Sequence, residues 1–342
     1  MSATEHVTLA LPSKGSIAEP TREFLRNCGL PVNKPNPRQY VGSILSIPTI
    51  NVLFQRAVDV LYKVTDGTAQ LGITGLDVIR EHPHEDLIVI HDKLGFGQCK
   101  LLIAVPESWV DVEHMLDLLD VADDFREKRR RNLRVVTKYP YLTRQFFHAE
   151  GLRHFTVVKA EGAIEAAPTI GYADIVVDLT QTGTTLRENH LKPLAGGIIV
   201  DSQACLVGNR PFLRENRLVL ETTRTLLEYI DAALQGREYY QITINIKGKD
   251  AASIAEQVAS NSLTSGLLGP TVSPVFSANI PDNPNGIWHT VTVVVRQQNL
   301  MQAVEHLRAI GGAQVVTVPV RYIFLEQSPT YTQLLEELGL TL

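Results

Sequence analysis

The sequence predicts an α/β protein built from two lobes, with a separate module at its C-terminal end. Over the first 236 residues, short apolar runs typical of strands alternate with amphipathic helical segments. This alternation indicates an α/β layout with mainly parallel sheets. The pattern restarts at residue 133, which indicates a second lobe, and changes again beyond Gly236, which marks the third part.

The first lobe is expected to begin with a buried strand and an amphipathic helix. Residues 7–11 form a short apolar run, as a buried strand requires. Residues 17–28 place Phe24, Leu25 and Cys28 on one side, and Gly29 ends this helix. The next expected elements are a strand and then a helix within 51–60, and strands at 71–74 and 87–90.

The second lobe is expected to follow the same pattern. A charged run at 126–131 indicates a solvated face at a helix end. The expected strands lie at 101–105, 133–137, 155–159 and 175–179, with a helix up to residue 147 and another near 164–167; a strand at 204–208 and a helix at 216–234 follow. Ligands of open α/β sheets bind at the carboxyl ends of strands, so a cleft between the lobes is the expected site.

The C-terminal part is expected to be an independent module. Strands are predicted at 240–246, 271–276, 288–296 and 315–320, and helices at 251–259 and 300–310. Their order is βαββαβ, which is typical of a ferredoxin-like module.

The bulk composition limits the class of protein. The chain has 342 residues, a formal net charge of −5, and 44% hydrophobic and 20% charged residues, which are ordinary values for a globular protein. The net charge favours neither nucleic acid nor an anionic membrane as partner. The three cysteines, Cys28, Cys99 and Cys205, form no zinc spacing or disulfide framework. Without a signal-peptide layout or an apolar run of about 18 residues, we expect a cytoplasmic protein.

The residues from 178 to 186 have the composition of a loop that binds phosphate. Gly183 permits unusual backbone angles, and the hydroxyls of Thr182, Thr184 and Thr185 can donate hydrogen bonds. A helix opening at 186–188 would turn its positive end toward the same anion. Asp178, just before the loop, could accept hydrogen bonds from sugar hydroxyls, so a ribose 5-phosphate would suit this segment. The alternative is a capped strand-to-helix turn without a ligand.

Residues 165–179, continuing to 182–186, resemble the signature of the ATP phosphoribosyltransferase family, the first enzyme of histidine biosynthesis. Segments 11–16, 71–78, 94–97 and 137–143 are also similar to segments of that family, in the same order. The resemblance covers essentially the whole chain and includes the C-terminal extension of the family's long form.

The resemblance implies a fold, a domain layout and a reaction. It implies a two-lobed, periplasmic-binding-protein-like core and a C-terminal ferredoxin-like regulatory domain. The implied boundaries are 1–98 with 200–236 for a discontinuous first lobe, 99–199 for the second lobe and 237–342 for the regulatory domain. The implied reaction joins N1 of the ATP adenine to C1 of phosphoribosyl pyrophosphate and releases pyrophosphate. It needs positioning and charge stabilisation rather than a covalent nucleophile.

Two cations are the candidate catalytic residues. Lys14 follows a buried strand and precedes Gly15, in a segment similar to the family's N-terminal loop. Arg56 lies in a segment similar to the one that places an arginine in the family's active site. Both could neutralise the departing pyrophosphate. The alternatives are a solvated loop lysine and a surface ion pair between Arg56 and Asp59.

Further substrate-binding candidates follow from the same resemblance. Gly72 and Gly75 allow a close backbone approach in a predicted loop, and Asp77 could orient Lys14 or Arg56 or cap the next helix. Tyr139 could pack on the ATP base or be a half-buried hinge residue. Glu165 could bind ribose hydroxyls or Mg²⁺-bound water, or begin a helix. Mg²⁺ is expected to be carried mainly by the pyrophosphate, with no metal site formed by the protein.

The C-terminal module is expected to bind histidine as a feedback inhibitor. The expected site lies near 267–273, with Leu268, Gly269 and Thr271 as the named candidates. The resemblance also implies a homo-oligomer, either a dimer or a hexamer. Three other functions remain alternatives: a two-lobed solute receptor, a catalytically silent regulatory paralogue and a ligand-binding transcription regulator.

Overall fold

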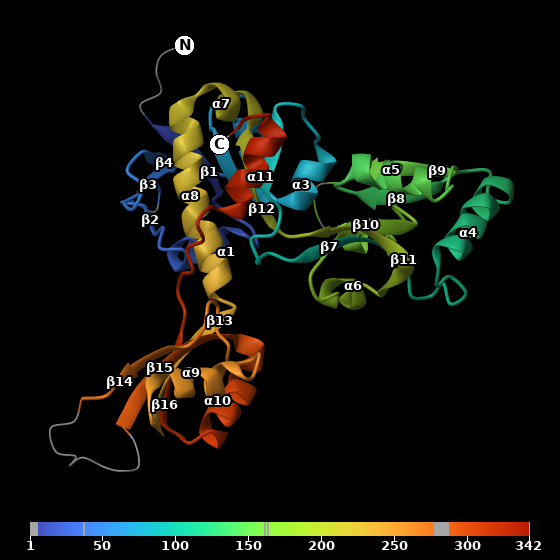
Figure 1. Ribbon diagram of the computed structural model, residues 1–342. Helices are drawn as coiled ribbons and strands as arrows, with labels where there is room; N and C mark the ends of the chain where they lie inside the picture. The colour runs from blue at the N-terminus through green and yellow to red at the C-terminus, as the bar shows by residue number, and fades with distance from the viewer. Residues whose placement is uncertain (1–5, 37, 161, 163, 277–286, 342) are drawn as a thin grey trace. The chain divides into compact units, whose positions relative to one another are not determined.

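The computed structural model describes residues 6–36, 38–160, 162, 164–276 and 287–341 (Figure 1). The chain forms two compact units. Unit 1 comprises Met1–Thr223 and Gln333–Leu342, and unit 2 comprises Arg224–Thr332. No helix in the described part of the chain combines the length and the apolar character needed to cross a membrane.

The first lobe of unit 1 is built on a seven-stranded sheet with the order β2-β3-β4-β1-β5-β12-β6. In that order the strands are Val32–Asn33, Val41–Ile44, Ile50–Gln55, Val7–Pro12, Leu71–Gly75, Ala204–Asn209 and Leu87–His91. The helices that accompany these strands are α1 (Ala18–Asn27), α2 (Ala57–Thr65), α3 (Leu76–Glu81) and α7 (Arg210–Glu215). Helix α8 (Arg217–Gly236) then leads out of unit 1.

Gly72 lies inside β5 because helix α2 packs closely on this strand. A Cβ atom at Gly72 would come within 2.6 Å of Val60 Cγ1 and 2.9 Å of Val64 Cγ2, both on α2. Gly72 therefore lies in the strand expected at 71–74, and Gly75 ends the same strand, so the loop expected around these two glycines is wrong. The reason is that five consecutive buried residues pair with strands on both sides.

The second lobe of unit 1 is built on a five-stranded sheet with the order β11-β7-β10-β8-β9. In that order the strands are Leu191–Ser202, Cys99–Pro106, Ile175–Thr180, Leu133–Thr137 and Phe155–Lys159. The accompanying helices are α4 (Met115–Glu127), α5 (Pro140–Ala149), the short 3-10 helix η1 (Ile164–Ala166) and α6 (Thr184–Glu188). Apolar side chains of α4 and α5, including Leu118 and Phe147, pack on one face of this sheet.

The expectation of mainly parallel sheets is wrong for both lobes. Strand β1 is parallel to β4 and β5, and β8 is parallel to β9 and β10, but the six other pairings are antiparallel. The parallel pairs are those joined through helices, as such crossovers require. Strands β2 to β4 follow one another through turns, and β12 returns from the second sheet to lie between β5 and β6.

Unit 2 confirms the predicted βαββαβ order. Its elements are β13 (Tyr239–Gly248), α9 (Ala251–Ala259), β14 (Thr271–Pro274), β15 (Ile287–Arg296), α10 (Leu300–Ala309) and β16 (Gly312–Pro319). The sheet order is β14-β15-β13-β16 with antiparallel pairs throughout, which is the ferredoxin-like arrangement. Alternate residues Ile242, Ile244 and Ile246 point into the core, together with Ile254 of α9 and Leu307 of α10.

The two units do not coincide with the domain boundaries expected from the sequence. Strand β11 keeps residues up to Ser202 in the second sheet. The end of helix α11 (Pro329–Leu338) belongs to unit 1, although it lies within the expected regulatory domain, 237–342. One contact within unit 1 is the hydrogen bond that Arg210 Nη1 donates to the Glu337 carbonyl at 3.2 Å.

Asp174 lies just before β10 and forms hydrogen bonds with Arg131, which precedes β8, and with Arg134, which lies in β8. Its carboxylate accepts hydrogen bonds from Arg131 Nη1 at 2.6 Å, from Arg134 Nη2 at 3.1 Å and from the Arg134 backbone N–H at 2.8 Å. Burial acts to raise the pKa of Asp174, but the hydrogen bonds from the two arginines outweigh it and hold the pKa at about 2. The ionised form is therefore favoured by the folded state.

We expect the free energy of unfolding to decrease at acid pH, where the Asp174 carboxylate becomes protonated. Because the folded pKa is depressed, the stabilisation is fully present above the unfolded pKa near 4 and is lost as the pH falls through about 2. Its size should be on the order of 1–2 kcal/mol, since both guanidinium groups are partly exposed. Asp174→Asn should remove this dependence in urea unfolding between pH 5 and pH 2. Asp124→Asn, which breaks an exposed pair with Lys128, is the control, and an equal effect of both changes would contradict the assignment.

Candidate functional site

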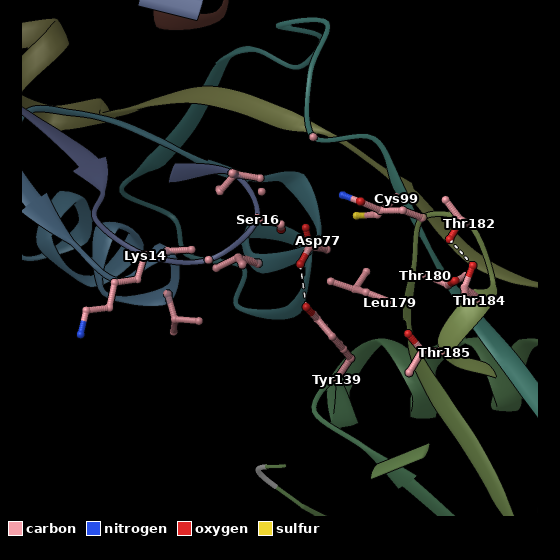
Figure 2. A pocket seen from close by; sticks show the side chains of 18 residues that line it. Lys14, Ser16, Asp77, Cys99, Tyr139, Leu179, Thr180, Thr182, Thr184 and Thr185 are labelled. Atoms are coloured by element: carbon pink, nitrogen blue, oxygen red, sulfur yellow. Dashed lines mark hydrogen bonds between the residues drawn. The ribbon is translucent and has the colours of Figure 1, made fainter. Parts of the chain in front are cut away.

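A cavity of about 470 Å³ lies between the two lobes of unit 1 (Figure 2). Its lining residues come from the segments after β1, β5 and β10, from the starts of α2, α3, α5, α6 and β7, and from the segment before β7. They are Lys14, Gly15, Ser16, Ile17, Ala57, Val58, Gly75, Asp77, Val78, Gly97, Cys99, Tyr139, Leu179, Thr180, Gln181, Thr182, Thr184 and Thr185. The cavity thus lies at carboxyl ends of strands, as the fold predicts.

The cavity brings together eight of the residues singled out from the sequence. These are Lys14, Gly15, Gly75, Asp77, Tyr139, Thr182, Thr184 and Thr185. Five other candidates lie outside its lining: Arg56, Gly72, Glu165, Asp178 and Gly183. Arg56 and Asp178 are chain neighbours of the lining residues Ala57 and Leu179, and Gly183 lies between two lining threonines.

Asp77 is a buried carboxylate held from two sides. Its Oδ2 accepts a hydrogen bond of 2.7 Å from Tyr139 Oη, shown as a dashed line in Figure 2. Its Oδ1 accepts one of 2.7 Å from Ser202 Oγ, which in turn accepts the Asp77 backbone N–H at 2.9 Å. The side chain of Asp77 is only 4% exposed, so these bonds replace its hydration. A side chain at Gly75 would collide with Oδ1.

The predicted role of Asp77 as a helix cap is therefore wrong, whereas a role in orienting Lys14 or Arg56 stays a prediction. Helix α3 begins at Leu76, with Gly75 at its N-cap position and no side-chain cap. Asp77 lies in the first turn with its Oδ1 close to Gly75, but the structure records no hydrogen bond from this carboxylate to a backbone N–H of α3. It joins Tyr139 to Ser202 instead.

The acid groups around Asp77 stay protonated. Burial, followed by the negative charge of Asp77, raises the pKa of Tyr139 far above its usual range. The same two causes raise the pKa of the Cys99 thiol to about 11. Tyr139 is therefore a hydrogen-bond donor and Cys99 a neutral thiol at the wall of the cavity, and neither is a base at neutral pH.

The loop after β10 forms a compact turn on the second-lobe side of the cavity. Gly183 has φ +72°, the left-handed region, and is the N-cap residue of α6. Its N–H donates to Thr180 Oγ1 at 2.9 Å, and the hydroxyls of Thr182 and Thr184 lie 3.0 Å apart (Figure 2). Helix α6 starts at Thr184, two residues before the expected start, so the lining residues Thr184 and Thr185 belong to its first turn, where backbone N–H groups have no partner within the helix.

Asp178 lies near Glu165, on the face of β10 opposite to the face that carries Leu179. Successive side chains of a strand alternate, so Asp178 points away from Leu179 and shares the face that carries η1 and α6. Burial raises the pKa of Asp178, and the charge of Glu165 raises it further. A hydrogen bond from the Leu179 backbone N–H and the charge of Lys138 lower it, but their effect is smaller. Arg56 is exposed at the N-cap position of α2, next to the lining residue Ala57.

Several residues that line the cavity, and one that contacts its lining, were not predicted. Ser16, Thr180 and Gln181 are neighbours of predicted residues, so longer loop windows would have included them. Gly97 lies in a segment that was noted only for its family resemblance. Ser202 carried no local signal, because its role depends on contact with Asp77 from a distant strand.

The candidate histidine-binding residues lie in unit 2, between α9 and β14. Leu268 is fully exposed, Gly269 has φ +124° and Thr271 is the first residue of β14. Thr264 anchors the start of this segment by donating its hydroxyl to the Val258 carbonyl at 2.6 Å. Their role in binding histidine stays a prediction.

Comparison with known proteins agrees with this arrangement. A family model described as ATP phosphoribosyltransferase matches residues 56–232, and one for the C-terminal domain of the same family matches residues 236–322. The chain is 40% identical, over 98% of its length, to "ATP phosphoribosyltransferase 2, chloroplastic" of Arabidopsis thaliana, 81% of which it covers. The chain belongs to the ATP phosphoribosyltransferase family.

The chain is also similar to bacterial members of the ATP phosphoribosyltransferase family. It is 34% identical to the ATP phosphoribosyltransferase of Bradyrhizobium sp. strain ORS 278, with 96% of this chain and 97% of that one aligned. The solved ATP phosphoribosyl transferase (HisG:HisZ) complex from Thermotoga maritima contains a chain that is 25% identical, with a TM-score of 0.51; the match covers 66% of this chain and 98% of that one. Since both family domains are present, the chain is a long-form member and a pentosyltransferase of histidine biosynthesis.

Proposed function

We propose that the chain transfers the phosphoribosyl group of phosphoribosyl pyrophosphate to N1 of the ATP adenine, and that histidine inhibits it. One observation carries the reaction: in a member of this family, the Thr-Gly-Thr-Thr turn of the second lobe and the Lys14 loop of the first lobe line the same cavity. The Lys14 ammonium group on one side and the threonine hydroxyls on the other suit a substrate that carries a phosphate at one end and a pyrophosphate at the other.

The proposed roles of the lining residues follow from their position, and those of Arg56, Glu165 and Asp178, which lie outside the lining, follow from the family resemblance. Thr182, Thr184 and Thr185 hold the 5-phosphate, and Asp178 with Glu165 accepts hydrogen bonds from the ribose hydroxyls. Lys14 and Arg56 neutralise the departing pyrophosphate. As C1 gains positive character and pyrophosphate leaves, fixed charges that need no reorganisation lower the barrier. Protonated Tyr139 lies at the cavity wall, where the adenine could stack on its ring.

Mg²⁺ is proposed to enter as the complex with pyrophosphate. In the described part of the chain, no group of three or more His, Cys, Asp or Glu side chains is placed to hold a metal ion. Asp77, the carboxylate that lines the cavity, already uses both oxygens for Tyr139 and Ser202. The ion would therefore keep its water and phosphate ligands.

The reaction is tested by mixing the protein with ATP, phosphoribosyl pyrophosphate and Mg²⁺. We expect pyrophosphate and N1-phosphoribosyl-ATP in equal amounts, and neither product when one substrate is left out. Binding of both substrates without pyrophosphate release would favour a silent paralogue or a two-lobed receptor instead.

The assembly and domain roles are also proposals. We propose catalytic lobes at 1–98 with 200–236 and at 99–199, a regulatory domain at 237–342, a homo-oligomer (dimer or hexamer) and a cytoplasmic location. The separate five-stranded sheet, with the threonine turn directly after its strand β10, supports the assignment of the second lobe. The separate core of unit 2 supports a distinct regulatory domain.

Histidine binding is tested on the full chain by calorimetry. Truncation near Gly236 should abolish inhibition and weaken oligomerisation, but it also removes residues 333–342, which belong to unit 1. Thr271→Ala is therefore the sharper change, with the exposed Thr317→Ala of the same sheet as control. We expect Thr271→Ala to weaken histidine binding while the rate without histidine stays unchanged. No heat of histidine binding to the intact protein would refute the sensing role.

A further inference from the structure

Helix α3 of the first lobe carries two buried carboxylates on one face. Asp77 and Glu81 are four residues apart, which places them one above the other on a helix. Each is only 4% exposed. Asp77 lines the cavity, whereas Glu81 does not.

Glu81 binds the start of a helix in the other lobe. Its Oε1 accepts the backbone N–H of Tyr141 at 2.8 Å, and its Oε2 accepts that of Leu142 at 3.0 Å. Both donors belong to the first turn of α5, where helical N–H groups have no partner within the helix. Pro140 precedes them and has no N–H, so the carboxylate takes the first two donors that α5 offers.

Tyr139 connects this contact to the cavity. It is the N-cap residue of α5 and provides no side-chain cap of its own. Its hydroxyl reaches back to Asp77 on the same face of α3 that holds Glu81. Two adjacent carboxylates of α3 thus hold two adjacent parts of the second lobe, the Tyr139 side chain and the first turn of α5.

We propose that Glu81 is a positioning residue for the phosphoribosyl transfer, one that holds α5 against α3 so that Tyr139 stays on Asp77 at the cavity wall. This inference rests on the proposed function of the cavity. The distance between α3 and α5 sets the separation of the first-lobe and second-lobe walls. A substitution of Glu81 would therefore release Tyr139 although Glu81 itself does not line the cavity.

The test uses the full chain with Glu81→Gln, and Glu85→Gln as the control. The amide keeps the shape but offers one acceptor in place of two and carries no charge toward the helix start. Glu85 is an exposed residue in the loop after the same helix. Incorporated 3-fluorotyrosine reports on Tyr139 by ¹⁹F NMR, with its signal assigned by its absence in Tyr139→Phe.

We expect the Tyr139 signal to move toward that of a solvated tyrosine in Glu81→Gln and to stay in place in Glu85→Gln. We also expect the turnover rate of Glu81→Gln to fall by roughly tenfold to a hundredfold, as for a small misplacement of an active-site group. In the Tyr139→Phe background the same change should cost little further, because both act through one contact.

Two outcomes would overturn the inference. One is an unmoved Tyr139 signal in Glu81→Gln, which would leave Glu81 as a helix cap without influence on the cavity. The other is independent rate losses that multiply in the double variant. If Glu81→Gln does not fold, Glu81→Asp, which keeps the charge and shortens the reach, provides the same readouts. The NMR signal needs no turnover, so it tests the contact even if the proposed reaction fails.

Discussion

Thr185→Ala is expected to weaken phosphoribosyl pyrophosphate binding by roughly tenfold to a hundredfold while leaving the fold intact. Thr185 lines the cavity in the first turn of α6, where its hydroxyl can donate to a phosphate oxygen. A hydrogen bond to a charged group contributes roughly 1.5–3 kcal/mol. Calorimetric titration of the substrate measures the loss, and thermal unfolding checks the fold.

Gly183→Val should have the larger effect, and the reason is the backbone. An added Cβ would meet nothing within 4 Å, but φ at Gly183 is +72°, which a β-branched residue strongly resists. The turn that orients the threonine hydroxyls would therefore change shape. Gly151→Val is a matched control, since Gly151 has φ +83° and equally open surroundings but follows helix α5, whereas Gly183 lies between two lining threonines.

The two glycine variants separate strain from binding. Both should lose similar stability, but only Gly183→Val should lose affinity for phosphoribosyl pyrophosphate. Unchanged binding in both Gly183→Val and Thr185→Ala would rule out the threonine turn as the phosphate site. Equal losses of affinity in Gly151→Val would show that strain alone explains the result.

The strands that could be predicted are those with continuous apolar runs. Strands β1 and β8 are buried along most of their length and β10 over its first half, and their sequences show this burial directly as apolar runs. Strand β11 was missed because Pro193, Gly196 and Gly197 interrupt its pattern, and its pairing with β7 shifts register there. Strand β2 has only two residues, too few for any periodicity.

In the candidate site, too, the features that could be predicted are those formed by a continuous stretch of sequence. The threonine turn is continuous in sequence, and its composition alone indicated a phosphate. The contacts of α3 join Asp77 to Tyr139 across 62 residues, Asp77 to Ser202 across 125 and Glu81 to Tyr141 across 60. No local pattern specifies such pairs, because they depend on how the two lobes fold against each other.

Lys14→Ala is expected to lower the turnover rate by roughly a hundredfold, the loss typical of removing one group that stabilises developing charge. Lys14 follows β1 and lines the cavity from the first lobe (Figure 2). The chain has a net charge of −5, so the pyrophosphate that leaves C1 must be neutralised locally. Charge grows on this group as the bond breaks, so the loss should appear in kcat more than in the KM for ATP.

Two matched variants decide whether the Lys14 ammonium group acts on the leaving group. Lys14→Arg keeps the positive charge and should retain more turnover than Lys14→Ala. Lys93→Ala removes an exposed lysine outside the cavity lining and should leave kcat unchanged. Normal turnover of Lys14→Ala at saturating substrate would refute the role, because a lysine that only raises local substrate concentration affects KM alone. A fall in kcat that Lys14→Arg partly restores places the charge at the departing pyrophosphate.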